Sequence, residues 1–444
     1  VNDGVAPLIK VKRLPKDPGP AAWNALLPPA PPARVLTEKI TADWLVIGAG
    51  WAGLAAARRL LQLRAGDRIA MLEASRVGEG PAGRNSGFMI DLPHDLASDN
   101  YNGAAESDHL QITMNRAAIA FAAEAAEELG MPAEAFSQIG KVNAAATDQG
   151  VRHLDDYARH LESLGEAYEA LDAKAMRELT GIPYYQQGLA TPGAAMVQPA
   201  MFVRAAAAAC ANLYEQSPVT ALERVDQDWC AKTPHGSITA PQVILAVNGH
   251  AESFGFFERR LMHVFTYASM SRELTAEETK RLGGQPTWGL LPADPMGTTV
   301  RRITGRVIIR NRFTYDPSLV VGDDRLEKVA RSHDRSFKAR FPMLDGVAMQ
   351  YRWGGRLCLS RNGVPAFGEV DENIFSACCQ NGLGTTKGTL AGMLAAELAA
   401  RTNNPMIKDM LAFEPPSRLP PEPLAWFGAN AVMRWKERKA GAEL

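Results

Sequence analysis

Residues 43–63, DWLVIGAGWAGLAAARRLLQL, decide the fold. An apolar run ends at Gly48 and passes into a segment whose apolar residues recur with helical spacing. This pattern predicts a buried strand, a tight turn and a helix. The apolar stretch RIAMLEAS, residues 68–75, predicts a second strand directly afterwards. Such a β-α-β unit opens a doubly wound parallel sheet, so we expect an α/β fold with a Rossmann-type domain.

The turn of this unit carries a G-x-G-x-x-G motif. Gly48 permits the tight turn, Gly50 lets the backbone approach a pyrophosphate, and Gly53 lets the helix pack closely against the sheet. Glu73 ends the second strand, where a carboxylate accepts hydrogen bonds from ribose hydroxyls. The predicted dinucleotide site therefore comprises Gly48, Ala49, Gly50, Trp51, Ala52, Gly53, Glu73 and Ala74.

A long glycine-containing loop, ASRVGEGPAGRNSG, follows at residues 74–87. In an NAD dehydrogenase the acidic residue is usually followed by another helix. Here the backbone amides of Gly83, Gly87 and their neighbours are available to a longer cofactor, which favours FAD. Arg84 either pairs with a phosphate or stays on the surface.

Composition and charge restrict the classes of partner. The 444 residues suffice for two or three domains, and the charged fraction of 22% is typical of a globular protein. A formal net charge of −1 gives no electrostatic reason to expect a nucleic acid or an anionic membrane as partner. We find no transmembrane stretch, secretory signal or metal-ligand spacing among the histidines. Five scattered cysteines favour reduced thiols, so we expect a cytoplasmic protein.

The remaining regions differ in pattern. Residues 1–37 are proline-rich and predict an extended arm, with Trp23 holding it against the body. Residues 255–355 contain several strand candidates. After residue 413 the chain is proline-rich and then basic. Helical patterns occupy residues 105–130, 151–165 and 199–214.

The motifs resemble those of the FAD-dependent D-amino acid oxidase superfamily, which includes glycine oxidase, sarcosine oxidase and gamma-glutamylputrescine oxidase. The first β-α-β unit and GRNSG, residues 83–87, are similar to the amino-terminal part of these enzymes. GRNSG is closest to the GRNGG of the gamma-glutamylputrescine oxidase branch. The resemblance continues through WGGRLCLSRNGVPAFGEV at residues 353–370 and NGLGTTKGTLAGMLAAELAA at residues 381–400.

This resemblance implies a discontinuous FAD-binding domain intertwined with a substrate-binding domain built on an antiparallel β-sheet. The FAD-binding domain comprises residues 38–100, 196–250 and 355–413, the substrate-binding domain comprises 101–195 and 251–354, and residues 1–37 and 414–444 form an arm and a tail. The implied further cofactor residues are Gly83, Arg84, Asn85, Ser86, Gly87, Val219, Ala246, Val247, Asn248, Gly355, Gly382, Gly384, Thr385, Thr386 and Lys387. A helix that begins near Thr386 would direct its positive end toward the reduced flavin.

Two positions depart from the family pattern T-x-D-x-x-P-x-I-G. Asn362 replaces the acid, and Ser360 stands for the threonine, so one hydrogen bond at this position changes. Relatives with covalently bound flavin use a cysteine in this region. Cys358 lies two residues before Ser360, which does not match that offset, so we expect noncovalent FAD.

One predicted hairpin, TVRRITGRVIIRNRFTY, sets the sequence apart from its relatives by four of its arginines, Arg301, Arg302, Arg310 and Arg312. Either they line a solvated edge strand, or one or two of them enter the substrate cavity and bind a carboxylate. We align Arg302 with the arginine of the family and choose it first. The further candidates for substrate contact are Arg310, Tyr267, Tyr351, Arg352 and His94.

The sequence supports three functional hypotheses. The first is oxidation of a C–N bond in a small-molecule amine or amino acid, by hydride transfer to FAD and hydrolysis of the imine. The second is a dehydrogenase that passes its electrons to a carrier instead of oxygen. The third is a flavoprotein subunit without turnover of its own. The substrate and the oligomeric state do not follow from the sequence.

Overall fold

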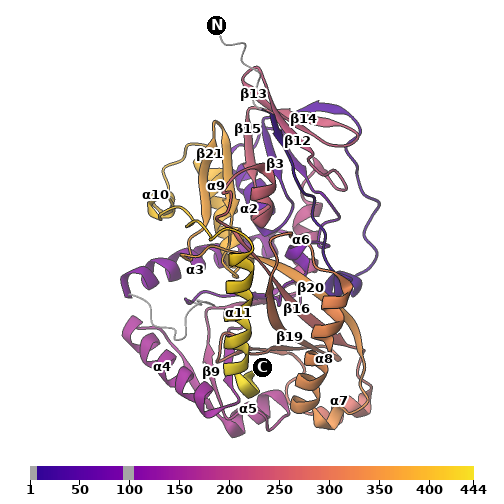
Figure 1. Cartoon of the computed structure of the whole chain (residues 1–444), viewed down its shortest axis with the longest axis vertical. Helices are drawn as coiled ribbons and strands as arrows, with labels where there is room; N and C mark the ends of the chain where they lie inside the picture. The colour runs from indigo at the N-terminus through magenta and orange to yellow at the C-terminus, as the bar shows by residue number, and fades with distance from the viewer. Residues whose placement is uncertain (1–7, 94–104) are drawn as a thin grey trace.

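A computed structural model describes residues 8–93 and 105–444 of the chain, whose strands form four sheets (Figure 1). The helices are α1 (Ala22–Ala25), α2 (Trp51–Leu63), α3 (Ala105–Glu128), α4 (Asp148–Leu164), α5 (Ala173–Thr180), α6 (Pro199–Ala208), α7 (Ala276–Leu282), α8 (Asp323–Arg340), α9 (Thr386–Ala399), α10 (Pro405–Ala412) and α11 (Leu424–Lys439). The predicted helices at residues 105–130, 151–165 and 199–214 correspond to α3, α4 and α6.

A six-stranded sheet contains the β-α-β unit and confirms the predicted α/β fold. Its order is β11 (Leu213–Tyr214), β4 (Ile69–Leu72), β3 (Trp44–Ile47), β15 (Gln242–Leu245), β22 (Ile374–Cys378) and β21 (Ala366–Asp371). All neighbours are parallel except β21 and β22. Helices α2 and α9 cover one face, and a five-stranded sheet packs on the other, so β3 and β4 are buried on both faces.

The five-stranded sheet has the order β1 (Leu8–Lys10), β12 (Ala221–Val225), β13 (Asp228–Lys232), β14 (Ser237–Ala240) and β2 (Lys39–Thr41). A small sheet of β5 (Phe88–Met89), β10 (Ala195–Val197) and β6 (Phe136–Ser137) lies where the glycine-containing loop ends. Strand β1 belongs to the proline-rich arm. The prolines of the arm suggested an extended segment without strand pairing, but β1 pairs with β12.

Glycines allow α2 and α9 to come unusually close. A Cβ atom placed on Gly392 would lie 1.9 Å from the carbonyl oxygen of Ala52. One turn earlier, a Cβ on Gly388 would lie 3.4 Å from the Cβ of Trp51. Because these glycines are four residues apart, they share one face of α9. The contact places the N-termini of both helices at the same end of the six-stranded sheet.

An eight-stranded sheet forms the second part of the molecule. Its order is β20 (Met349–Leu359), β16 (Met262–Ser271), β19 (Arg306–Tyr315), β18 (Thr299–Ile303), β17 (Trp288–Pro292), β7 (Lys141–Ala145), β9 (Gln187–Thr191) and β8 (Glu169–Asp172). Only β17 and β7 pair in parallel. The predicted boundary of the FAD-binding domain at residue 355 falls within β20, which belongs to this sheet; the division into domains stays a prediction.

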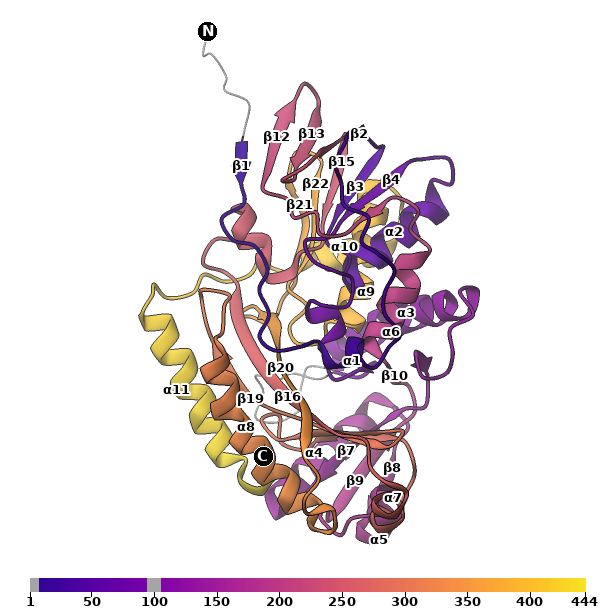
Figure 2. The same ribbon diagram turned by 90° about the vertical axis from the view of Figure 1, so that its right-hand side faces the viewer.

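The two faces of this sheet have different neighbours. On one face, helix α8 packs against β16 and β19, and Ser269 and His333 share a hydrogen bond of 2.7 Å. On the opposite face, Ala268 and Trp353 form a cluster with Trp23 of the arm. The arm runs from β1 down to α1, at the junction of the two parts of the molecule (Figure 2). We call the face that contacts the arm the inner face.

Helix α11, in the region after residue 413, lies along the exposed edge of β19. Strand β18 pairs with β19 only as far as Arg310, so the remainder of β19 has a free side. Asn430 there bonds both the amide and the carbonyl of Tyr315, at 3.0 Å each. Glu437 accepts from the amide of Phe313 at 2.9 Å. The proline-rich and basic composition of this region did not predict a helix.

Candidate active site

A cavity of about 210 Å³ opens at the end of the six-stranded sheet where α2 and α9 begin. Its walls come from segments that are distant in the chain: the arm, the glycine motif, the loop after Glu73, the segment after β15, strand β20 and the turn before α9. The residues predicted for the cofactor that line it are Gly48, Ala49, Gly50, Trp51, Ala52, Glu73, Ala74, Asn85, Val219, Ala246, Val247, Asn248, Gly382 and Gly384.

The glycine motif has the geometry that a bound pyrophosphate requires. Gly48 has a φ of +101°, and a Cβ on Gly53 would lie 1.7 Å from the carbonyl oxygen of Gly48. Gly50 is the N-cap of α2 and provides no side chain to cap the first turn. The first amides of α2 therefore remain available to an anion in the cavity.

Glu73 is held in place by backbone amides. Its carboxylate accepts from the amides of Ala49 and Ser75, at 2.9 Å each. Burial raises the pKa of Glu73, and these hydrogen bonds oppose part of that rise. The carboxylate lines the cavity, so its remaining lone pairs are available to donors such as ribose hydroxyls.

The glycine-containing loop turns only part of itself toward the cavity. Arg84 is buried and donates to the carbonyls of Pro18 and Gly354, at 3.0 and 3.2 Å, and is not a cavity-lining residue. This arginine thus joins the arm to β20. The carbonyls of Ser86 and Gly87 accept from Arg301, at 3.2 and 3.0 Å.

The turn before α9 brings Gly382 and Gly384 to the cavity. The next residues, 385–387, do not line the cavity. Thr385 donates through its hydroxyl to the carbonyl of Phe88. The hydroxyl of Thr386 is buried without a partner in the part of the chain that the structure describes. The predicted cofactor residues outside the cavity wall are Gly53, Gly83, Arg84, Ser86, Gly87, Gly355, Thr385, Thr386 and Lys387.

Sequence reasoning missed a charged group in the wall of the cavity. Arg356 donates to both carboxylate oxygens of Asp17 in the arm, at 2.9 and 3.0 Å, and both side chains are buried. The third guanidinium nitrogen of Arg356, Nη1, contacts Nε2 of His250. Burial and the charge of Arg356 lower the pKa of His250 to about 2, so this histidine is neutral and accepts the hydrogen bond. Asp17 and Arg356 are 339 residues apart, and no local pattern links them.

The arginines of the hairpin divide between the two faces of the eight-stranded sheet. Arg301 lies on the inner face, where its guanidinium stacks near Trp23 and Phe88. Arg302, our first choice from the sequence, lies on the opposite face and donates to the carbonyl of Gly283 after α7. Adjacent residues of a strand point to opposite sides, so Arg302 does not share the inner face with Arg301, and its role in substrate binding stays a prediction.

Arg310 shares the inner face with Arg301. Its register partner on β18 is Thr299, two residues before Arg301, so both arginines project to the same side. The guanidinium of Arg310 lies 4.9 Å from the ring centroid of Phe313, and among the described residues it has no hydrogen-bond partner. Burial lowers the pKa of both Arg301 and Arg310 to about 10. Neither arginine has a carboxylate partner in the described chain.

The other candidates for substrate contact are dispersed. Tyr267 packs on the α8 side, where it shares a 2.6 Å hydrogen bond with Thr314, and burial raises its pKa to about 12. Arg352 points to the same side and pairs with Asp334 on α8 at 2.7 Å. Tyr351 lies on the inner face, at the edge of the Trp23 cluster. His94 falls outside the described residues.

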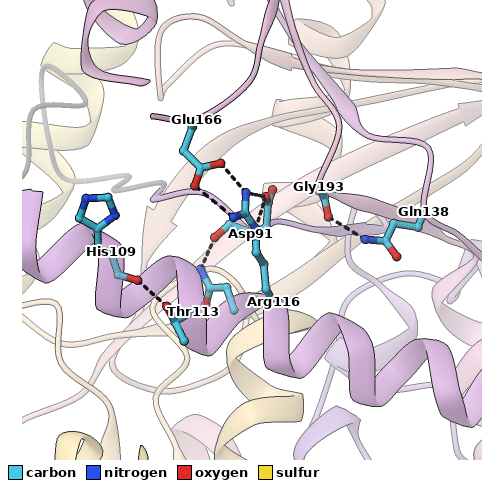
Figure 3. Close-up of polar contacts among 8 residues, drawn as sticks. Asp91, His109, Thr113, Arg116, Gln138, Glu166 and Gly193 are labelled. Atoms are coloured by element: carbon cyan, nitrogen blue, oxygen red, sulfur yellow. Dashed lines mark hydrogen bonds and ion pairs between the residues drawn. The ribbon is translucent and has the colours of Figure 1, made fainter. Parts of the chain in front are cut away.

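An ion-pair network centred on Arg116, whose side chain is half exposed, follows β5 (Figure 3). Asp91 is fully buried and accepts from Arg116 of α3 at 3.1 Å, and Arg116 also donates to Glu166 at 3.0 Å. The backbone carbonyl of Asp91 accepts from Asn115 at 3.0 Å. Burial lowers the pKa of nearby Lys141 to about 8. This network holds the segment that follows β5 against α3. Its residues do not line the cavity.

Within residues 8–93 and 105–444, no three His, Cys, Asp or Glu side chains are grouped as metal ligands. No helix of the described chain is both long and apolar enough to cross a membrane.

The Rossmann-type sheet, the glycine motif and the cavity beside an eight-stranded sheet define a flavin-dependent oxidoreductase of two-part architecture. The chain belongs to the family described as FAD dependent oxidoreductase (DAO), which matches residues 43–398. It is therefore a FAD enzyme, as the sequence predicted.

Known relatives agree with this assignment. The chain is 27% identical to gamma-glutamylputrescine oxidoreductase of Escherichia coli (strain K12), with 83% of this chain and 85% of the relative covered. It is 26% identical to probable oxidoreductase OrdL of Rhizobium meliloti (strain 1021), over 87% and 89%. Its fold is similar to that of glycine oxidase from Geobacillus kaustophilus, with a TM-score of 0.66 at 20% identity, covering 86% of this chain and 100% of the other.

Proposed function

We propose that the protein oxidises a C–N bond of an amine or amino acid that carries a carboxylate. The substrate loses a hydride from the carbon beside nitrogen and a proton from nitrogen, and the resulting imine is hydrolysed to a carbonyl compound. Bound FAD supplies the two-electron acceptor. The name of the Escherichia coli relative, which refers to an amine, supports this class of substrate.

The observation that carries the proposal is the unpaired pair of arginines on the inner face. Arg301 and Arg310 lie among apolar and aromatic side chains without an anionic partner among the described residues. Arg301 is buried and Arg310 is partly buried. A guanidinium held away from water without a counter-ion is costly, and a carboxylate of the substrate would compensate its charge bidentately. We assign Arg310 as the principal ligand, because the guanidinium of Arg301 is already bonded to three backbone carbonyls.

Other groups of the chain have positioning roles in this proposal. The first amides of α2 bind the pyrophosphate, and Glu73 binds the ribose. The N-terminus of α9 faces the flavin and stabilises the negative charge that reduction creates there. The neutral form of the substrate amine is favoured by the apolar surroundings of the inner face, because desolvation disfavours the ammonium.

The same proposal includes noncovalent FAD. Cys358 lines the cavity, but its sulfur lies in an apolar cluster with Cys378 and Cys379, and burial raises its pKa well above the ordinary value. A thiol that resists ionisation is a poor nucleophile toward the flavin ring. Denaturing the yellow protein should release all flavin into the supernatant; flavin that stays with the polypeptide would contradict noncovalent binding.

The decisive experiment is anaerobic mixing of the purified flavoprotein with a panel of amino acids, N-methylated amino acids, gamma-glutamyl amines and opines. We expect one carboxylate-bearing amine to bleach the flavin spectrum and its decarboxylated analogue to fail. Bleaching by the analogue alone would overturn the carboxylate assignment, and no bleaching by any compound would favour a subunit without turnover. Hydrogen peroxide formed on admitting air distinguishes an oxidase from a dehydrogenase that needs a carrier.

A further inference from the structure

Residues 11–18 of the arm form part of the wall of the cofactor cavity. Val11, Arg13, Leu14 and Pro15 line the cavity, and Leu14 is 47% exposed. The arm has no helix or strand at this point, so this part of the wall is a single segment of chain without regular secondary structure. It precedes residue 43, where the family match begins, so the family assignment says nothing of its role.

The segment is fastened at both ends and, between them, by the side chain of Arg13, which donates to the carbonyl of Pro317 at 2.5 Å. At its start, the amides of Val11 and Lys12 donate to Thr220 and Ser253, at 2.9 Å each. At its end, the carbonyl of Pro18 accepts from the amide of Gly354 at 3.0 Å. Proline lacks an amide hydrogen, so Pro15 adds no bond in between. The two fastenings lie on the two parts of the molecule, beside β12 and on β20.

The ion pair between Asp17 and Arg356 adds a buried charged contact to these fastenings. Both side chains are buried, so their attraction is only weakly screened by solvent. His250 holds the guanidinium on its other side and is neutral, so it does not compete for the charge. Loss of the carboxylate would leave a buried arginine unpaired, which weakens the closed arrangement more than loss of a surface pair.

We propose that residues 11–18 form a strap across the FAD site, and that FAD enters and leaves only after this strap detaches. The Asp17–Arg356 ion pair then sets the rate of FAD release. The strap keeps water away from the cavity while FAD is bound, and it docks after FAD during assembly. This inference depends on FAD binding and not on the identity of the substrate.

The first test measures FAD release from the holoprotein after dilution, followed by the rise in flavin fluorescence. Asp17→Asn should release FAD about tenfold faster or more, since one buried charge pair is lost. Asp334→Asn is the matched control, because it removes the partner of Arg352 on the same strand but away from the cavity. Equal release rates for Asp17→Asn and the parent would overturn the proposal, as would an equal acceleration by the control.

A second variant tests the opposite direction and does not depend on a weakened fold. Lys10 and Ala221 lie directly opposite each other in the β1–β12 pair, within the range that a disulfide spans. Lys10→Cys with Ala221→Cys should slow FAD release when oxidised and restore the parent rate on reduction. Identical rates in the two redox states would contradict a strap that must also detach at its β1 end.

Limited proteolysis gives a third readout without activity. Lys12, Arg13 and Lys16 are exposed trypsin sites within the strap. Bound FAD should slow cleavage at these sites, because a protease acts on the detached segment. Cleavage at the same rate with and without FAD would show that the strap does not respond to the cofactor, and would refute its role.

Discussion

Arg301 and Arg302 are neighbours in the chain, but their guanidinium groups lie on opposite faces of the eight-stranded sheet. Arg301 bonds carbonyls of the flavin-site loop, whereas Arg302 bonds the carbonyl of Gly283 beneath α7. Strand alternation thus assigns the two arginines to different environments. Arg310 shares the inner face with Arg301, so the first prediction concerns Arg310.

Replacement of Arg310 by methionine should impair the binding of a carboxylate substrate. A charge-assisted hydrogen bond is worth ~1.5–3 kcal/mol, so kcat/KM should fall by about 10- to 100-fold. Arg302→Met is the control and should change kcat/KM by less than about threefold. Steady-state kinetics on the substrate found by flavin bleaching checks both. A larger loss in the Arg302 variant would assign substrate binding to Arg302 and to the face of the sheet opposite the inner face.

FAD affinity should depend on pH through Glu73. Hydrogen bonds from ribose hydroxyls need the ionised carboxylate, and burial raises its pKa. FAD should therefore bind more tightly as the pH rises through that raised pKa, and then reach a plateau. The apoprotein should show the opposite trend and lose stability over the same window, because its folded state holds the proton more tightly than the unfolded state.

Fluorescence titration of the apoprotein with FAD at several pH values measures this dependence. At pH values where the FAD affinity of the parent protein has reached its plateau, Glu73→Gln should bind FAD about 10- to 100-fold more weakly than the parent. The FAD affinity of the variant should change little with pH. A parent protein whose FAD affinity is flat from acid to neutral pH would exclude Glu73 as the titrating group.

Alanine at position 53 should abolish the FAD site. Its Cβ would overlap the carbonyl oxygen of Gly48, so α2 must move away from the turn. We expect a loss of about 3 kcal/mol or more in the free energy of unfolding and a colourless protein. Gly66→Ala is the control, since nothing lies within 4 Å of its Cβ position. Urea unfolding and the flavin spectrum give the two readouts, and a yellow Gly53→Ala protein of parental stability would refute the close-packing role.

The Asp91–Arg116 pair should stabilise the fold independently of FAD. Arg116→Met leaves a buried carboxylate unpaired; because the arginine itself is half exposed, we expect a loss of about 1–3 kcal/mol. A double variant with Asp91→Asn should recover part of this loss. Arg159→Met, which breaks an exposed pair with Asp156, should cost less than about 0.5 kcal/mol. Additive losses in urea unfolding would show that Asp91 and Arg116 are not coupled.

The parts of the fold that depend on local pattern followed from the sequence. Gly48, Gly53 and Glu73 lie in one β-α-β unit, where glycine spacing and strand periodicity act over a few residues. The start of α9 near Thr386 was predicted for the same reason. The faces of the arginine hairpin were not, because a shift of one residue in the alignment exchanges the two sides of a strand.

Contacts between distant segments had no local signal. The pairing of Asp17 with Arg356 arises only when the arm lies across the assembled cavity. Arg84 was assigned to a phosphate or the surface, whereas the fold makes it a bond between the arm and β20. The roles of the predicted substrate and cofactor residues stay predictions.

Helix α11 takes the place that another strand would occupy beside β19. Asn430 and Glu437 reproduce with side chains the hydrogen bonds that a neighbouring backbone would offer. A helix in this position ends the growth of the sheet, since it cannot pair with a further strand on its other side. Helix α11 thereby prevents the free side of β19 from pairing with a strand of another molecule. Removal of the helix would expose this edge.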